Sequence, residues 1–91
     1  MESMPRYHFN IRNGDGFTLD DEGLDMLSDM DAQVQAIRGA RSLLSAEVME
    51  GTLDLDGQIE VTDDHNERVL TVRFRDAVHI RQSEGSSTAT R

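Results

Sequence analysis

The sequence contains no cysteine, no tryptophan and no lysine, and it has only three phenylalanines, one tyrosine and one proline. Without cysteine, the chain cannot form disulfides, thiolate metal sites or a thiol nucleophile, which suits a reducing cytoplasm. With so few aromatic residues among 36% hydrophobic residues, the core can only be thin. A thin core in one 91-residue domain is often completed by a partner or by a second copy.

Long apolar segments are also missing. No apolar run approaches the roughly 18 residues of a membrane span. The first residues, MESMPRYHF, lack both the basic region and the apolar stretch of a signal peptide. We therefore expect a cytoplasmic protein with no membrane association.

Recognisable catalytic motifs are absent as well. The chain has no GxSxG, P-loop, HExxH or dinucleotide-binding pattern. Asp76 interrupts an inward-facing apolar series, and we expect it to pair with an arginine or to cap a strand end. The sequence thus predicts a protein that is not an enzyme and that binds no cofactor.

What is present alternates between strand and helix patterns. Residues 6–12, 17–19, 58–62 and 68–75 have the period-two apolar pattern of strands, and Asn13 to Gly16 form a turn. Between them, a helix is predicted from Ser28 or Asp29 as N-cap to Glu50, followed by Gly51. The prediction is an α+β fold in the order β-β-α-β-β, with one amphipathic helix packed on a three- to four-stranded antiparallel sheet.

This fold should occupy residues 4–82, after a stub at 1–3 and before a disordered Ser/Thr-rich tail at 83–91. Its core is predicted from the inward positions of the strands and the apolar positions of the helix. The predicted core residues are Tyr7, Phe9, Ile11, Phe17, Val34, Ile37, Leu44, Val48, Ile59, Val61, Leu70, Val72 and Phe74.

The stretch TLDLDGQIEVTD, residues 52–63, resembles a calcium-binding EF-hand loop in part. Asp54, Asp56 and Asp63 would be its carboxylate ligands, and Gly57 its turn residue. The first ligand would be a threonine, however, and a strand replaces the second helix that an EF-hand requires. The prediction is therefore no metal site, with these three aspartates as weak candidates.

Charge is segregated along the chain, which carries 18 acids and nine arginines for a net charge of −9. The basic residues of the first and last strands have outward parity, so they could form one Arg-rich sheet face. That predicted interaction surface comprises Arg6, His8, Arg12, Arg73, Arg75, His79 and Arg81. His8 and His79 would be neighbours if the first and last strands paired, but two imidazoles make a poor metal site.

Three stretches, MPRYHFNIRNGDG, LDLDGQIEVTD and VLTVRFRDAVHI, are similar to a family of short bacterial proteins classed only as a domain of unknown function. The family members open with Met-Pro-Arg-Tyr and close with a Phe-x-Asp-Ala-Val pattern. This resemblance implies no activity and no cofactor. More loosely, the order of strands, acidic loop and helix resembles HicB-like antitoxins.

These observations favour a protein-interaction or regulatory module whose partner is another small protein or a second copy of the chain. The alternative is a regulator that binds nucleic acid through the Arg-rich face. Two observations oppose it: the net negative charge, and the lack of outward aromatic residues to stack on bases.

Overall fold

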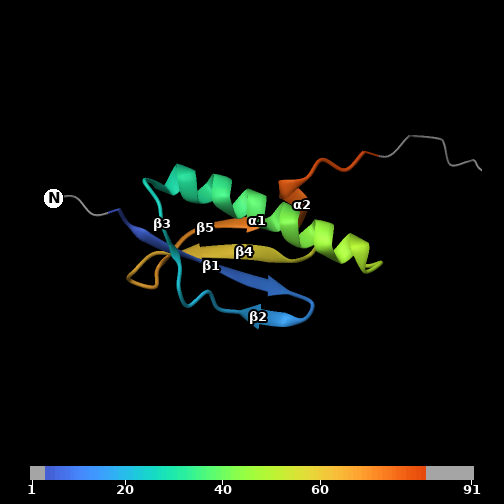
Figure 1. Ribbon diagram of the computed structural model, residues 1–91, viewed down its shortest axis with the longest axis horizontal. Helices are drawn as coiled ribbons and strands as arrows, with labels where there is room; N and C mark the ends of the chain where they lie inside the picture. The colour runs from blue at the N-terminus through green and yellow to red at the C-terminus, as the bar shows by residue number, and fades with distance from the viewer. Residues whose placement is uncertain (1–3, 82–91) are drawn as a thin grey trace, which may run out of the picture.

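The computed structural model describes residues 4–81, in which one long helix lies across an antiparallel sheet (Figure 1). In chain order the elements are β1 (Arg6–Asn13), β2 (Gly16–Thr18), β3 (Leu24–Asp25), α1 (Asp29–Met49), β4 (Gln58–Thr62), β5 (Arg68–Arg73) and α2 (Phe74–Ala77). The predicted α+β class is confirmed. The prediction of three or four strands is wrong because β3 adds a fifth, and the predictions for residues 1–3 and 83–91 lie outside the described residues.

The sheet has the order β2-β1-β4-β5, and β3 pairs with β1 beyond the end of β2. β4 therefore lies at the centre, with Phe9 opposite Val61 on one side and Leu70 opposite Val61 on the other. These side chains share the face that packs against α1. The predicted parity of the first, third and fourth main strands is confirmed. No helix within residues 4–81 is long and apolar enough to cross a membrane.

The ends of α1 are set by local capping. Ser28 is the N-cap, and its Oγ accepts a hydrogen bond from the Asp31 backbone at 3.3 Å. At the other end Gly51 has φ +88°, and the Gly51 and Thr52 amides donate to carbonyls of the last turn. This is the glycine-terminated C-cap expected of the sequence.

The buried face of α1 consists mostly of alanines. Its fully buried positions are Ala32, Ala36, Ala40 and Leu44. The helix packs over β4, β5 and α2 rather than over β1. Phe74 and Val61 are the largest fully buried side chains of the core, and three of the four buried helix positions are alanines. The predicted core positions Val34 and Val48 are therefore wrong, and both side chains are exposed.

Most of the other predicted core residues do lie in the core. The buried ones are Tyr7, Leu44, Ile59, Val61, Val72 and Phe74, and the half-buried ones are Phe9, Ile11, Ile37 and Leu70. Phe17 is exposed because the hairpin register puts it opposite Arg12, on the outer face of the sheet. Its ring lies 4.5 Å from the Arg12 guanidinium carbon, which is a cation–π distance.

The last strand is shorter than predicted. β5 ends at Arg73, and the next four residues form α2. Phe74 still reaches the core, since its amide donates to the Gly57 carbonyl at 2.9 Å and its ring lies against Gly57. Asp76 is exposed in the first turn of α2, so it does not end a strand as expected.

Candidate functional site

The edge of the sheet beside β1 has a gap between β2 and β3, and the Asp20 carboxylate fills it. Phe9 lies between the two segments of β1 that these strands pair with. Asp20 Oδ2 accepts a hydrogen bond from the Phe9 amide at 3.0 Å, and Oδ1 accepts one from the Gly23 amide at 3.1 Å. A side chain thus satisfies a backbone donor that would otherwise have no strand partner.

The same loop is tied to the outer face of the sheet through Asn10, the one buried polar side chain among residues 4–81. Its carbonyl oxygen accepts a hydrogen bond from the Asp20 amide at 2.9 Å. Its Nδ2 donates to the Glu60 carbonyl and the Thr62 hydroxyl, at 3.2 and 3.3 Å. Every hydrogen-bonding group of the buried amide therefore has a partner, which is what burial requires.

These contacts set the charge state of Asp20. Partial burial alone would raise the pKa of its carboxyl, but the Phe9 and Gly23 amides and nearby His8 hold the pKa below its ordinary value. The carboxylate is therefore ionised at neutral pH, with both oxygens occupied. It is a structural acceptor and not an available base.

Gly23 allows the loop to approach β1. Its φ is +72°, and a Cβ at this position would lie 2.7 Å from the Tyr7 carbonyl oxygen. A side chain would therefore push the loop away from the strand. In the sequence, the only signal for this arrangement is an aspartate three residues before a glycine, which by itself predicts no site.

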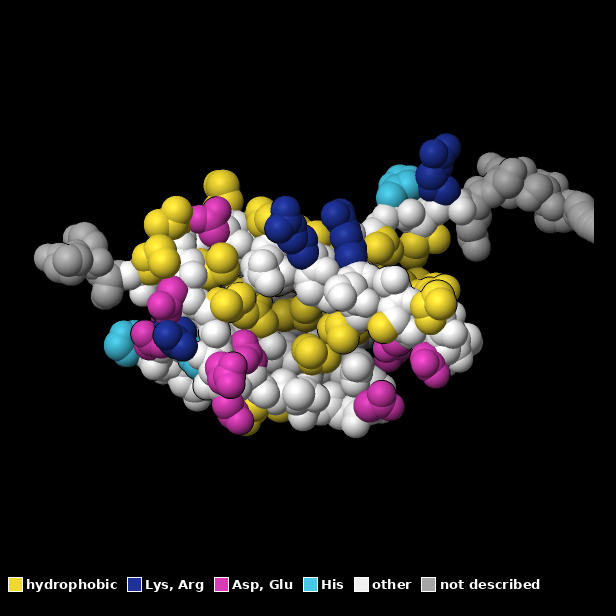
Figure 2. Space-filling model, in the orientation of Figure 1, with side chains coloured by type: hydrophobic (Ala, Val, Ile, Leu, Met, Phe, Trp, Pro, Cys, Tyr) yellow, Lys and Arg dark blue, Asp and Glu magenta, His cyan; other side chains and the backbone are white. Residues whose placement is uncertain are grey.

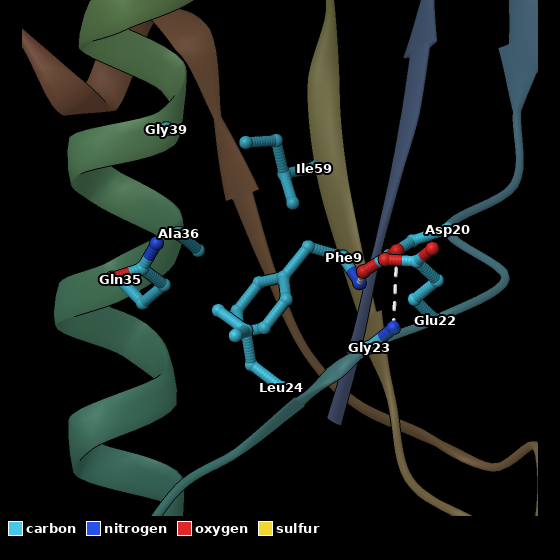
Figure 3. A pocket seen from close by; sticks show the side chains of 9 residues that line it. All are labelled: Phe9, Asp20, Glu22, Gly23, Leu24, Gln35, Ala36, Gly39 and Ile59. Atoms are coloured by element: carbon cyan, nitrogen blue, oxygen red, sulfur yellow. Dashed lines mark hydrogen bonds between the residues drawn. The ribbon is translucent and has the colours of Figure 1, made fainter. Parts of the chain in front are cut away.

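Above this edge lies a cleft of about 320 Å³ between α1 and the loop that leads into β3. Figure 3 shows the Phe9 ring pointing into it from β1, with Leu24 on the loop side and Ala36 and Gln35 on α1. Ile59 and Gly39 complete the wall nearest the core. Figure 2 shows apolar side chains gathered in a band between α1 and the strands below it.

The cleft combines an apolar floor with a few polar side chains. Its floor is apolar, and its two acids are Asp20 and Glu22. Asp20 is fully hydrogen-bonded, and Glu22 is exposed. No lining residue is a histidine, serine or cysteine. The site can hold an apolar group and offers amide and carboxylate acceptors around it.

A second cleft, of about 360 Å³, lies where the sheet meets the start of α1, and it contains Tyr7. The Tyr7 hydroxyl donates to Asp29 Oδ1 at 2.6 Å. This hydrogen bond, together with burial and the negative charge of Asp29, raises the pKa of Tyr7 to about 12. The phenol is thus a neutral tie between β1 and the helix, which the sequence did not predict.

The predicted Arg-rich face does not assemble as one surface. Arg75 lies in α2, and His79 and Arg81 follow it, because β5 ends at Arg73. The other four, Arg6, His8 and Arg12 on β1 and Arg73 on β5, keep the predicted outward parity. On the face that Figure 2 shows, the Arg and His side chains lie near the two ends of the molecule and along α1.

Three of the predicted arginines are also held in ion pairs. Arg6 pairs with Asp25 at 3.1 Å, Arg12 with Glu60 at 2.9 Å, and Arg75 with Asp56 at 2.9 Å. The hydrogen bond from Arg12 is the largest cause of the lowered pKa of Glu60, and it outweighs burial, which alone would raise that pKa. The segregated charges of the sequence therefore meet in part within the fold.

The histidines do not meet. His8 lies on β1, and β4 separates β1 from β5, so the strand pairing that would make His8 and His79 neighbours does not occur. His8 Nδ1 lies 2.7 Å from the Asp20 carbonyl oxygen. His65 lies in the turn from 63 to 67, where the Asp63 carboxylate accepts hydrogen bonds from the His65 and Glu67 amides.

The weak calcium candidates are likewise separated, because the whole of β4 lies between Asp56 and Asp63. Asp54 accepts hydrogen bonds from the Gly14 and Asp56 amides, both at 3.0 Å. It therefore ties the β1–β2 turn to the loop after α1. Within residues 4–81, no three His, Asp or Glu side chains are placed to hold one metal ion.

Comparison with known proteins gives one match. The sequence model of a family described as a domain of unknown function, DUF6894, matches residues 6–75. No curated protein and no solved structure matches the chain. The match covers every element from β1 to β5, including the Asp20 loop and the cleft above it.

Proposed function

The chain belongs to the DUF6894 family, whose function is unknown, and we propose from its geometry that it is a non-enzymatic protein-interaction module. One observation carries the proposal. Because α1 packs mainly over β4 and β5, residues 4–81 leave a cleft open between α1 and the β1 side of the apolar sheet face. Open apolar surface of this kind is typical of interaction sites.

The cleft fits an apolar side chain of a partner protein. Phe9 and Ile59 form an apolar floor, whereas Gln35 and Glu22 offer polar groups around it. An apolar centre within a polar rim is the usual anatomy of a protein interface. The looser resemblance to HicB-like antitoxins supports the same class, and the lack of cysteine supports a cytoplasmic location.

Leu24 offers a direct way to find that partner, because its side chain is 46% exposed and lines the cleft. We would place a photo-crosslinking amino acid at Leu24 in the native host, with Asp15 in the β1–β2 turn as the matched exposed control. The expected result is a crosslinked protein from position 24 that position 15 does not give.

Binding of the captured protein must then be reconstituted with purified components. Leu24→Asp should abolish binding while the circular dichroism spectrum stays unchanged, and Asp15→Asn should not affect it. Equal capture from both positions, or unchanged binding by Leu24→Asp, would refute the cleft as the site.

The competing proposal is a nucleic-acid-binding regulator. It is supported by Arg73, which is exposed on the outer face of the sheet, and is opposed by the pairing of Arg6, Arg12 and Arg75 with acids. A gel-shift titration distinguishes the two proposals. Binding that weakens steeply with salt and disappears in Arg73→Glu with Arg75→Glu would favour the regulator.

A further inference from the structure

The edge of the sheet formed by β5 is bare. In the described residues β5 pairs with β4 alone. The Phe74 amide donates to Gly57, so alternation turns the backbone groups of Val72 toward β4 and those of Thr71 and Arg73 away from it. An exposed edge of this kind is a template for another strand.

Large apolar side chains of α1 are exposed on the flank next to this edge. Met30 and Val34 are 73% and 49% exposed, and Ile37 continues the same line at the spacing of one helix turn. One turn further, Arg41 Nε donates to the Ala77 carbonyl of α2, which follows β5. We call Met30, Val34 and Ile37 the β5-side stripe.

The stripe lies away from the cleft. Gln35 and Gly39, which line the cleft, are on the opposite flank of α1. The two exposed apolar regions are therefore separate surfaces. A partner in the cleft would leave both the stripe and the β5 edge uncovered.

We propose that a second copy of the chain covers the β5 edge and the β5-side stripe, with a two-fold axis relating the copies. The two β5 strands would pair antiparallel near Thr71, which joins the sheets. The two α1 helices would then lie side by side on the same face. Met30, Val34, Ile37 and Arg41 are spaced by four, three and four residues, the repeat with which helices pack along a seam.

Charge argues for a second copy as the occupant. At the start of β5, Asp63, Asp64 and Glu67 outnumber Arg68, whereas at its end Arg73 and Arg75 outnumber Asp76. Antiparallel pairing places the acidic end of one β5 beside the basic end of the other, and parallel pairing would not.

Charge along α1 follows the same order, with acidic residues before basic ones. Asp29 and Asp31 lie in the first turn of α1, and Arg38 and Arg41 lie further along it. Side by side and antiparallel, each acidic turn approaches the arginines of the other copy. The arrangement is self-complementary, as a two-fold interface must be.

The test is the mass of the full chain in solution over a wide dilution series, measured by analytical ultracentrifugation. The wild-type chain should form a dimer that dissociates on dilution. Val34→Glu should raise the dissociation constant by at least about 100-fold, because each dimer buries two substituted side chains. Val48→Glu is the matched control: Val48 is similarly exposed and lies on the same line of the helix, but well past Arg41, beyond the end of the proposed seam. It should leave the dimer intact.

A second measurement locates the interface. In the dimer, the Thr71 and Arg73 amides should exchange with solvent slowly, and in Val34→Glu they should exchange fast. A monomer at all concentrations, a dimer that Val34→Glu leaves unchanged, or one that Val48→Glu or Leu24→Asp dissociates equally would overturn the proposal. Because the cleft and the β5 edge are separate surfaces, this result is independent of the crosslinking result at Leu24.

Discussion

On the β1 side, β2, β3 and the Asp20 carboxylate close the edge of the sheet, whereas on the β5 side no strand of residues 4–81 pairs with the edge. The closed edge depends on particular residues, since Asp20 and Gly23 hold a loop against β1. Within the described residues, no strand pairs with the open edge, and β5 ends at Arg73. The comparison indicates that the β5 edge is the one left available for a partner strand.

The largest effect should come from Gly23→Ala, which attacks the closed edge. We expect a loss of about 3 kcal/mol in the free energy of unfolding, because the new Cβ meets the Tyr7 carbonyl oxygen and the backbone keeps a positive φ. Urea denaturation measures it.

Gly51→Ala distinguishes the cost of the close contact from the cost of the positive φ. Gly51 also has a positive φ, of +88°, but a Cβ there would meet nothing within 4 Å. It should cost only about 1 kcal/mol. Equal losses from the two substitutions would mean that the contact between loop and strand has no role in closing the edge.

Asp20→Ala should have the next largest effect. It leaves the Phe9 and Gly23 amides without their acceptor, which costs about 2–3 kcal/mol for hydrogen bonds to a charged group. Asp21→Ala is the control, since Asp21 is an exposed neighbour of the same charge. Hydrogen exchange of the Phe9 amide should accelerate in Asp20→Ala alone.

The effect of Asp20 should also depend on pH. Because its folded-state pKa is lowered, its contribution to stability is present above its unfolded pKa of about 4. The contribution is lost as the pH falls through the lower folded value. The difference between wild type and Asp20→Ala should therefore shrink in acid, and a constant difference would contradict the ionised acceptor.

Strand parity could be predicted from the sequence, because in this sheet one face packs on the helix and the other faces outward. Phe9, Val61 and Val72 lie where their alternation placed them. The end of β5 could not be predicted in this way. Phe74 continues the alternation and is buried, yet it belongs to α2, so parity alone does not distinguish a strand from a turn of helix with the same inward residue.

The packed face of α1 was predicted only in part: Leu44 and Ile37 lie in or against the core, whereas Val34 and Val48 are exposed. The helix carries two apolar lines, one of large residues including Val34 and one of alanines including Ala36. Burial of apolar area alone favours the large residues. Most of the buried positions are nevertheless alanines, because Phe74 and Val61 already occupy the core next to the helix. The space that remains depends on contacts between residues distant in sequence. Val34, which was expected in the core, instead belongs to the β5-side stripe.

The Asp20 site could not be predicted because the role of Asp20 depends on how the strands pair. An aspartate in an acidic loop is ordinary, and only the register of β1 with β2 and β3 shows that Phe9 lacks a strand partner.

A smaller effect is expected at Tyr7, where β1 beside β3 is tied to the helix. Tyr7→Phe removes the hydrogen bond to Asp29 and should cost about 1 kcal/mol. The chain has one tyrosine and no tryptophan, so its phenolate absorbance reports this group alone. With a pKa of about 12, it should titrate well above the ordinary value of 10.

Stability should follow the same titration. A raised pKa means that the contribution of Tyr7 is complete below pH 10 and is lost as the pH rises toward about 12. Tyr7→Phe should remove this alkaline loss. Titration at the ordinary value in the folded chain would show that Asp29 does not accept from the phenol.

The smallest effect compares one arginine from each side of the sheet. Arg12 lies between Glu60 on β4 and Phe17 on β2, but its side chain is exposed, so Arg12→Gln should cost only about 0.5 kcal/mol. Arg73→Gln, at the open edge, should cost nothing measurable in the dilute monomer. Nuclear magnetic resonance titration gives a sharper reading, because the pKa of Glu60 should rise in Arg12→Gln, where its main cause of lowering is gone. A rise of the same size in Arg73→Gln would mean that the pKa of Glu60 depends on the total charge of the outer sheet face. The direct contact between Arg12 and Glu60 would then have no particular role.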